Sequence, residues 1–316
     1  MHIAVYLPLV LPLAAAPSAR WLAARLDPRV ATGLLTVVAL GLAAAGGIAL
    51  TALAATAVGQ IPLLGALGDW SVWVLRRDDP ASLTLALVAC VLLTAALATA
   101  GRTLVRRVRA LADAARTARL LPLAGPRDQV VVLDDPTPDA YALPGAPGRI
   151  VVSTGMLDAL DEREQRVLFA HERAHLACGH HLFVTLAYVA AATNPLLLPV
   201  AAAVRYSTER WADEHAARVV GDRRLVARTI AKAALLTRRG VPAAALGIAT
   251  GLVGRLRGPG PVPRRVAALL ATPPRQRRLL LAVTLGVLVL AALSSIEAAR
   301  DLDALFELAR AGTGPA

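Results

Sequence analysis

The pentapeptide His171-Glu172-Arg173-Ala174-His175 is the part of the chain whose residue types and spacing point most directly to chemistry. Two histidines four residues apart on an α-helix lie on one face, so both imidazoles can bind one metal ion. The glutamate between them is placed to act as a general base on water that the metal activates. The pentapeptide therefore predicts a metal-dependent hydrolytic site carried by a helix.

A catalytic zinc needs a third protein ligand and an open position for water. The best candidate lies in the charged segment 206–215, where Glu209 and Asp213 are four residues apart and share one helix face. We expect Glu209 to bind the metal and Asp213 to accept a hydrogen bond from a ligand histidine. Such a pair on its own is usually a solvated helix face, so this assignment depends on the upstream histidines.

The remaining polar residues near these segments are weaker candidates. His180 and His181 follow the pentapeptide too closely to return to the metal, and we expect them to be polar residues where the helix meets the membrane surface. An oxyanion could be stabilised by a further side chain besides the metal. The candidates for that role are Tyr206, Arg210 and His215.

The composition indicates a membrane protein. Of the 316 residues, 56% are hydrophobic, and the mean hydropathy is +0.57; soluble domains are usually about 45–50% apolar. The net charge of +12 comes almost entirely from arginine, and arginines cluster beside apolar runs. That placement is typical of cytoplasmic flanks of membrane spans rather than of nucleic-acid binding. We therefore expect a lipid bilayer as a partner and no nucleic acid.

The first third of the chain, residues 1–101, is predicted to form three transmembrane helices. The apolar runs are 3–16, 30–58 and 81–100. The second run is longer than a bilayer core of about 30 Å requires, so it should tilt or kink near Gly46-Gly47. The arginines at 20–29 and after residue 101 predict a cytoplasmic position for those segments and an outward position for the loop 59–80.

Residues 102–278 are predicted to form a metallopeptidase domain on the cytoplasmic side. Residues 102–120 have the pattern of a basic amphipathic helix leaving the membrane, and strands are expected at 130–133 and 149–153, separated by a Pro/Gly/Asp-rich stretch. Asp161 and Glu164 form a capping-box pattern that begins the helix of the pentapeptide.

The apolar run 182–204 separates the two parts of the predicted metal site. A single membrane crossing would leave Glu209 about 30 Å from the histidines. Asn194-Pro195 in the middle of the run favours a turn, so we predict a re-entrant helical hairpin that returns Glu209 to them. A last transmembrane helix is expected at 279–296, followed by a short outward-facing tail at 297–316.

In this order the segments resemble the integral-membrane gluzincin metallopeptidases, of the BlaR/MecR transducer branch and the related HtpX and CAAX-prenyl-protease type. The resemblance covers about residues 102–225, and the Asn-Pro hairpin favours the BlaR/MecR branch. It rests on the following segments: Asp139–Gly145, Arg149–Gly155, Leu157–Leu160, Glu164, His171–His175, Asn194-Pro195 and Glu209–Asp213.

The resemblance implies a polytopic helical membrane protein with an α+β zincin-like domain that binds one zinc ion per chain. The zinc ligands would be His171, His175 and Glu209, and Glu172 would be the base. The strand at 149–153 would be the edge strand that aligns an extended peptide. The chain lacks the large sensor domain that β-lactam transducers carry after the last span, so direct antibiotic sensing is not expected.

The sequence thus predicts a zinc endopeptidase at the cytoplasmic membrane face. Regulatory cleavage of a protein, such as a cytoplasmic transcriptional repressor, is one reading, and broad quality control of membrane proteins is another. A non-catalytic membrane scaffold or transporter is disfavoured, because the predicted spans carry almost no ionisable residues of the kind a transport pathway needs.

Overall fold

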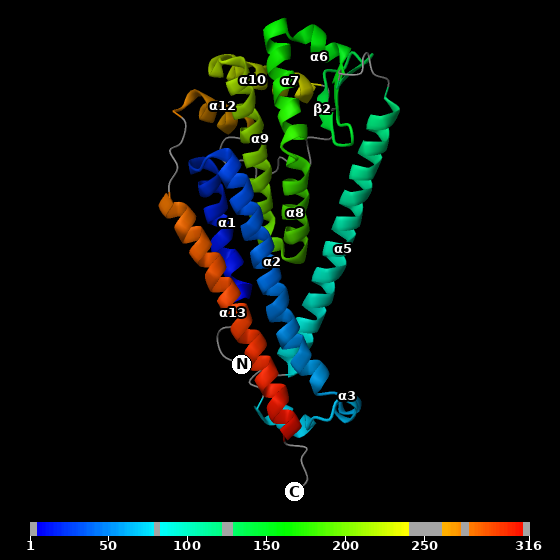
Figure 1. Ribbon diagram of the computed structural model, residues 1–316, viewed down its shortest axis with the longest axis vertical. Coiled ribbons are helices and arrows are strands. Elements are labelled where there is room, and N and C mark those ends of the chain that lie inside the picture. The colour runs from blue at the N-terminus through cyan, green and yellow to red at the C-terminus, as the bar shows by residue number, and fades with distance from the viewer. Residues whose placement is uncertain (1–4, 79–82, 122–128, 240–260, 273–277, 312–316) are drawn as a thin grey trace.

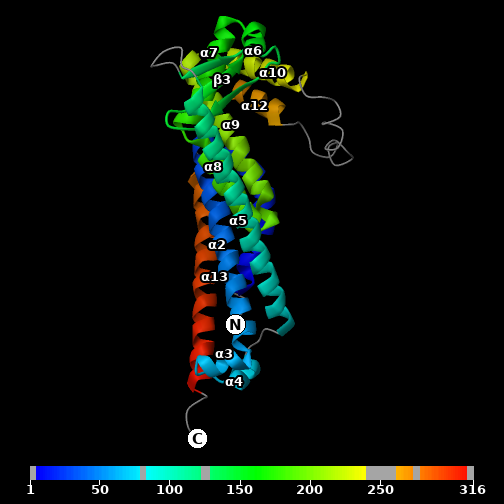
Figure 2. The ribbon, with the colours of Figure 1, turned by 90° about the vertical axis from the view of Figure 1, so that its right-hand side faces the viewer.

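The structure is a computed structural model that describes residues 5–78, 83–121, 129–239, 261–272 and 278–311. It is mostly helical and has one three-stranded sheet. Long helices form an elongated bundle, and the sheet and several shorter helices form a head at one end of it (Figures 1 and 2). This arrangement of a helical bundle with a small α+β head agrees with the predicted class of fold.

The bundle is built from four long helices: α1 (Leu7–Arg25), α2 (Pro28–Gly59), α5 (Leu83–Leu120) and α13 (Arg278–Ala311). Two short helices, α3 (Pro62–Leu67) and α4 (Val72–Asp78), lie at the end remote from the head (Figure 1). Within the described residues, three helices are long and apolar enough to cross a membrane, namely α2, α5 and the part of α13 from Leu280. The two halves of α1 meet at a bend of 50° and qualify only when they are taken together.

The helix boundaries differ from the sequence-based expectation in four places. Helix α1 continues to Arg25 instead of ending near residue 16. The predicted loop 59–80 contains α3 and α4. Helix α2 runs through Gly46-Gly47 without a break, so of the two expected adjustments only the tilt stays a prediction. Helix α5 joins the third predicted span and the basic segment 102–120 into one helix. The ends of the predicted spans were placed where charged residues begin, and charged residues alone do not end a helix.

The fourth difference is at the C-terminal end, where the predicted tail 297–316 does not form a separate segment. Helix α13 continues without interruption to Ala311. Its last turns pack against α4, with Leu305 and Ala309 in a small cluster around Leu75, and Ser71 N–H donates to the Ala309 carbonyl. Because this end has apolar partners, it stays helical and docked.

The head contains the sheet and the helices that follow it. The strands are β1 (Val130–Leu133), β2 (Ala140–Leu143) and β3 (Arg149–Ser153). The helices are α6 (Thr154–Ala159), α7 (Glu162–Ala177), α8 (His180–Thr193), α9 (Leu198–Val220), α10 (Arg223–Arg239) and α12 (Pro261–Leu270). The predicted capping box at the start of α7 is confirmed, because Asp161 accepts from Glu164 N–H and Glu164 accepts from Asp161 N–H.

The sheet order corrects the prediction that the strand at 149–153 is an edge strand. β3 lies in the centre, parallel to β1 and antiparallel to β2. Both of its edges are therefore already paired, and all five of its residues are buried. The edge strand beside the predicted site is β2, which lies in the Pro/Gly/Asp-rich stretch that was expected to be a connection. Its four residues are all apolar or aromatic, so they lack the alternation of polar and apolar side chains that predicts a strand.

Helices α8 and α9 form the predicted hairpin, which turns at Asn194-Pro195. The Asn194 Oδ1 accepts from Leu196 N–H at 3.0 Å, so the turn satisfies its own polar groups. Near the tip, the Thr99 hydroxyl of α5 donates to the Ala192 carbonyl at 2.6 Å. The tip also borders a cavity shared with Gly46 and Gly47, which places it beside the middle of α2 and returns α9 to the head.

The first turn of α6, directly after β3, gives a test of this fold. A Cβ added to Gly155 would lie 2.0 Å from the Pro136 carbonyl oxygen. The Gly155→Ala variant is therefore expected to lose about 1–3 kcal/mol of unfolding free energy, as overpacked sites do. Thermal unfolding of the purified protein measures this loss.

The matched control for this test is Gly101→Ala on α5, where a Cβ would meet no heavy atom within 4 Å. That variant should be more stable than the parent by about 0.5–1 kcal/mol, because alanine favours the helix interior over glycine. Equal midpoints for both variants would contradict the close approach of residues 136 and 155.

Candidate metal centre

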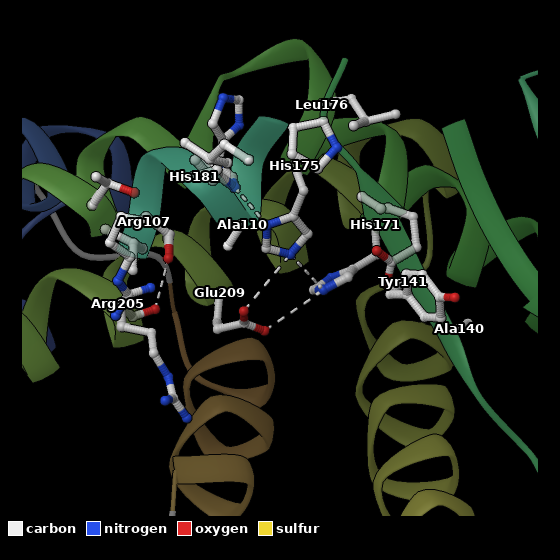
Figure 3. A pocket seen from close by; sticks show the side chains of 18 residues that line it. Arg107, Ala110, Ala140, Tyr141, His171, His175, Leu176, His181, Arg205 and Glu209 are labelled. Atoms are coloured by element: carbon white, nitrogen blue, oxygen red, sulfur yellow. Dashed lines mark hydrogen bonds and ion pairs between the residues drawn. The ribbon is translucent and has the colours of Figure 1, made fainter. Parts of the chain in front are cut away.

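The predicted ligand residues lie together at the junction of α7 and α9 (Figure 3). His171 Nε2 and His175 Nε2 are 3.1 Å apart. Glu209 Oε2 lies 3.7 Å from His171 Nε2, and Glu209 Oε1 lies 3.8 Å from His175 Nε2. The side chains belong to helices far apart in sequence, and the hairpin brings them face to face.

These separations fit a metal ion. Zinc binds histidine nitrogen and carboxylate oxygen at about 2.0–2.2 Å, so ligand atoms on a tetrahedron are about 3.3–3.6 Å apart. The observed spacings of 3.1–3.8 Å bracket that range. Two imidazoles with one carboxylate are also a ligand set of catalytic zinc sites that keep a fourth position open.

Asp213 lies in contact with one of the histidines. Its side chain is 1% exposed, and Asp213 Oδ1 lies 3.1 Å from His171 Nδ1. Because this contact is made by the nitrogen that faces away from His175, it leaves His171 Nε2 directed toward the other ligands.

Arg265 on α12 completes the charge balance and was not predicted. Its guanidinium donates to both oxygens of Asp213, at 2.7 and 2.6 Å, and lies 2.8 Å from Glu209 Oε2. One cation thus holds both Glu209 and Asp213 of α9 in place. Nothing in the sequence around residue 265 distinguishes this arginine from its neighbours, so only the packing of α12 against α9 reveals it.

The position of His180 differs from the prediction made from the sequence. Gly179 adopts a left-handed conformation with φ of 61°, which turns the chain sharply after α7. His180 is consequently 2% exposed, and its Nδ1 lies 3.0 Å from His175 Nδ1. It is therefore a positioning residue for His175 rather than a polar residue at a membrane surface.

The electrostatics of the centre favour a cation between the ligands. Burial alone would lower the pKa of His171, but Asp213 and Glu209 outweigh it and raise that pKa to about 10. Burial would likewise raise the pKa of Glu209, but His171 and Arg265 hold it well below its usual range. Asp213 and Glu209 thus favour positive charge on His171 in the metal-free centre, and a bound metal ion would replace that proton. Burial and the charge of His171 lower the pKa of His175 to about 4.

Glu172 has the environment of a general base. It is 9% exposed and lines the same cleft as both histidines. Burial raises the pKa of its carboxyl to about 7, even though charged His171 and the hydrogen bond from Ala142 N–H favour the ionised form. A carboxyl with a pKa near neutrality can both accept and return a proton.

The three weaker oxyanion candidates do not face the cleft. Buried Arg210 donates to the Ala23 carbonyl of α1, and the Tyr206 ring lies under the guanidinium of Arg264 at 4.4 Å. His215 is absent from the described lining of the cleft, as are the other two. These residues support the packing of α9 instead.

Two histidines and a glutamate around a metal position, with a second glutamate as base, define the class of metallopeptidases. The comparison with known families agrees: the model of peptidase family M48 matches residues 101–280. Since this is more than half of the chain, the protein belongs to peptidase family M48, whose members are zinc-dependent. No curated protein and no solved structure matches the chain. The assignment to the BlaR/MecR branch stays a prediction.

The third ligand can be tested by metal analysis. We expect the parent to bind one zinc ion per chain and Glu209→Ala to lose it, because a catalytic zinc needs three protein ligands and the variant keeps only two imidazoles. Glu214→Ala is the matched control, since Glu214 is on the same helix but pairs with Arg223. Full zinc occupancy in Glu209→Ala would exclude Glu209 as a ligand.

The role of His180 gives a second prediction. His180→Ala should weaken zinc affinity about 10- to 100-fold, as the loss of groups that orient metal ligands does. Competition with a chelator measures the affinity of the folded variant. His215→Ala should keep the parent affinity, and an unchanged affinity in His180→Ala would show that the contact with His175 has no orienting effect.

Proposed function

We propose that this M48 protein is a zinc endopeptidase that hydrolyses peptide bonds of protein substrates at the cytoplasmic face of the membrane. The observation that carries the proposal is the convergence of His171, His175 and Glu209 at metal-ligand spacing with buried Glu172 beside them. Zinc bound there supplies Lewis acidity, which polarises a carbonyl group and acidifies water.

The chain's own groups supply the remaining steps. Glu172 takes a proton from the attacking water on its carboxylate and passes it to the nitrogen of the leaving amine. Asp213 and His180 hold the two histidine rings in place, and Arg265 holds Glu209. An extended peptide fits along β2, because Ala140, Tyr141 and Ala142 of this edge strand line the cleft.

The position at a membrane is supported by three observations. Helices α2, α5 and α13 have the length and hydropathy of spans. The hairpin tip reaches only the middle of α2, which fits a re-entrant segment that protein covers on several sides. The basic cluster at 20–29 lies at the head end, where Arg29 stacks over Trp211 at 5.7 Å, which favours a cytoplasmic active site.

We keep limited, regulatory cleavage as the first role and broad degradation as the second, since the cleft is compatible with both. Its volume is about 520 Å³ and its walls come from α5, β2, α7, α8 and α9. A space of that size admits a few extended residues and excludes a folded domain. A cytoplasmic repressor with an exposed segment would be such a substrate. Proteomics of a deletion strain distinguishes the roles: one stabilised protein supports regulation, and many support quality control.

Glu172→Gln tests the catalytic assignment. The variant should keep its zinc, because Glu172 is not a ligand, and should lose about 10²- to 10⁴-fold in turnover of a casein-type substrate, because it cannot take up the proton. Glu162→Gln, at the exposed start of the same helix, is the matched control. Parental turnover in Glu172→Gln would exclude this mechanism.

A further inference from the structure

Two arginines line the cleft beside the metal centre. Arg107 comes from α5 and Arg205 from α9, and both belong to the lining that also contains His175 and Glu209. Figure 3 shows the two arginines on the side of Glu209 opposite Tyr141. The cleft therefore has a basic end, with the metal centre between that end and Tyr141 of the edge strand.

Neither arginine is neutralised by an acid within the described parts of the chain. The guanidinium of Arg107 lies over the ring of Tyr188 at 4.9 Å, which holds it against the hairpin without pairing its charge. The carboxylates of the cleft are Glu172 and Glu209, and Glu209 is already held by Arg265. The basic end thus offers two guanidinium groups to a ligand.

Arg107 is oriented differently from its neighbours on α5. Arg102, Arg106 and Arg109 are exposed, whereas Arg107 is half-buried, and it alone of these four lines the cleft. Basic residues on the outer side of such a helix are suited to lipid headgroups. A half-buried arginine that borders the substrate cleft is suited to the substrate itself.

We infer that Arg107 and Arg205 bind a carboxylate of the peptide substrate and make this peptidase selective for acidic sequences. The inference rests on the proposed function. Guanidinium and carboxylate form charge-assisted, often bidentate hydrogen bonds, and two guanidinium groups from different helices can bind one carboxylate from two sides. The carboxylate belongs either to an aspartate or glutamate side chain or to the C-terminus of the substrate.

The register of α9 fixes where this carboxylate lies. Arg205 precedes Glu209 by four residues, which is about 6 Å along the helix axis. An extended peptide covers that distance in about two residues. The acidic group should therefore lie within about three residues of the scissile bond, on the side directed away from Tyr141.

The experiment uses the purified full-length protein, loaded with zinc, and a peptide library whose cleavage sites are read by mass spectrometry. The parent should prefer aspartate or glutamate at one fixed position near the cut. Arg107→Ala and Arg205→Ala should each lower kcat/KM for acidic peptides about 10- to 100-fold and leave peptides with glutamine at that position unaffected. Arg205→Glu should shift the preference toward lysine and arginine.

The matched controls are Arg106→Ala and Arg218→Ala, which remove exposed arginines from the same two helices and should keep the acidic preference. Amidated and free C-termini in the library separate the two sources of the carboxylate. If amidation abolishes cleavage while internal glutamate has no effect, the bound group is the C-terminus.

Binding separates this inference from the proposed function. Fluorescence anisotropy of Glu172→Gln with matched glutamate and glutamine peptides reports recognition without turnover. Charge-dependent binding without cleavage by the parent would support the arginine site and overturn the peptidase. Cleavage without acidic preference would overturn only the arginine site. The arginine site would also be overturned if the arginine variants lost binding to phosphatidylglycerol vesicles but kept the peptide selectivity of the parent. That result would assign the two arginines to lipid binding.

Discussion

The antiparallel return of α9 along α8 is the constraint on which the rest of the structure depends. Of the three residues that could hold a metal, His171 and His175 lie on α7 and Glu209 lies on α9, so the cluster exists only if the chain reverses between them. The reversal at Asn194-Pro195 satisfies its own backbone through the Asn194 side chain and lies beside α2 and α5. Pro195 and Leu196 are exposed, so the hydrogen bond from Leu196 N–H to Asn194 matters most at the tip.

Buried charge sets the second condition. Asp213 is almost fully buried and contacts both His171 and Arg265. Removing one partner of such a group is costly, typically about 3–5 kcal/mol, because the remaining charge stays buried. The network therefore ties α7, α9 and α12 together as firmly as it orients the ligands. Orientation and stability depend on the same contacts here, since Glu209 and Asp213 are each shared between a histidine and Arg265.

The sequence allowed the local features with strong chemical signatures to be predicted. The ligand spacing on α7, the capping box at Asp161 and the turn at Asn194-Pro195 all follow from interactions within a few residues. Two of the features that were missed depend on contacts between residues far apart in the sequence, and the third depends on a backbone conformation. β2 is a strand because β3 pairs with it, and Arg265 matters because α12 packs against α9. His180 turns inward because Gly179 adopts a conformation that its type permits but does not require.

The anchoring of α9 on α1 has a thermodynamic consequence. Arg210, the residue after Glu209, is buried and donates to the Ala23 carbonyl. The carboxylate ligand therefore cannot shift without moving the backbone of the bundle. Two equilibria that share a structural element are linked reciprocally. If a metal ion binds at Glu209, whatever loosens the packing of the N-terminal helices would weaken its binding by the same free energy by which the bound ion tightens that packing.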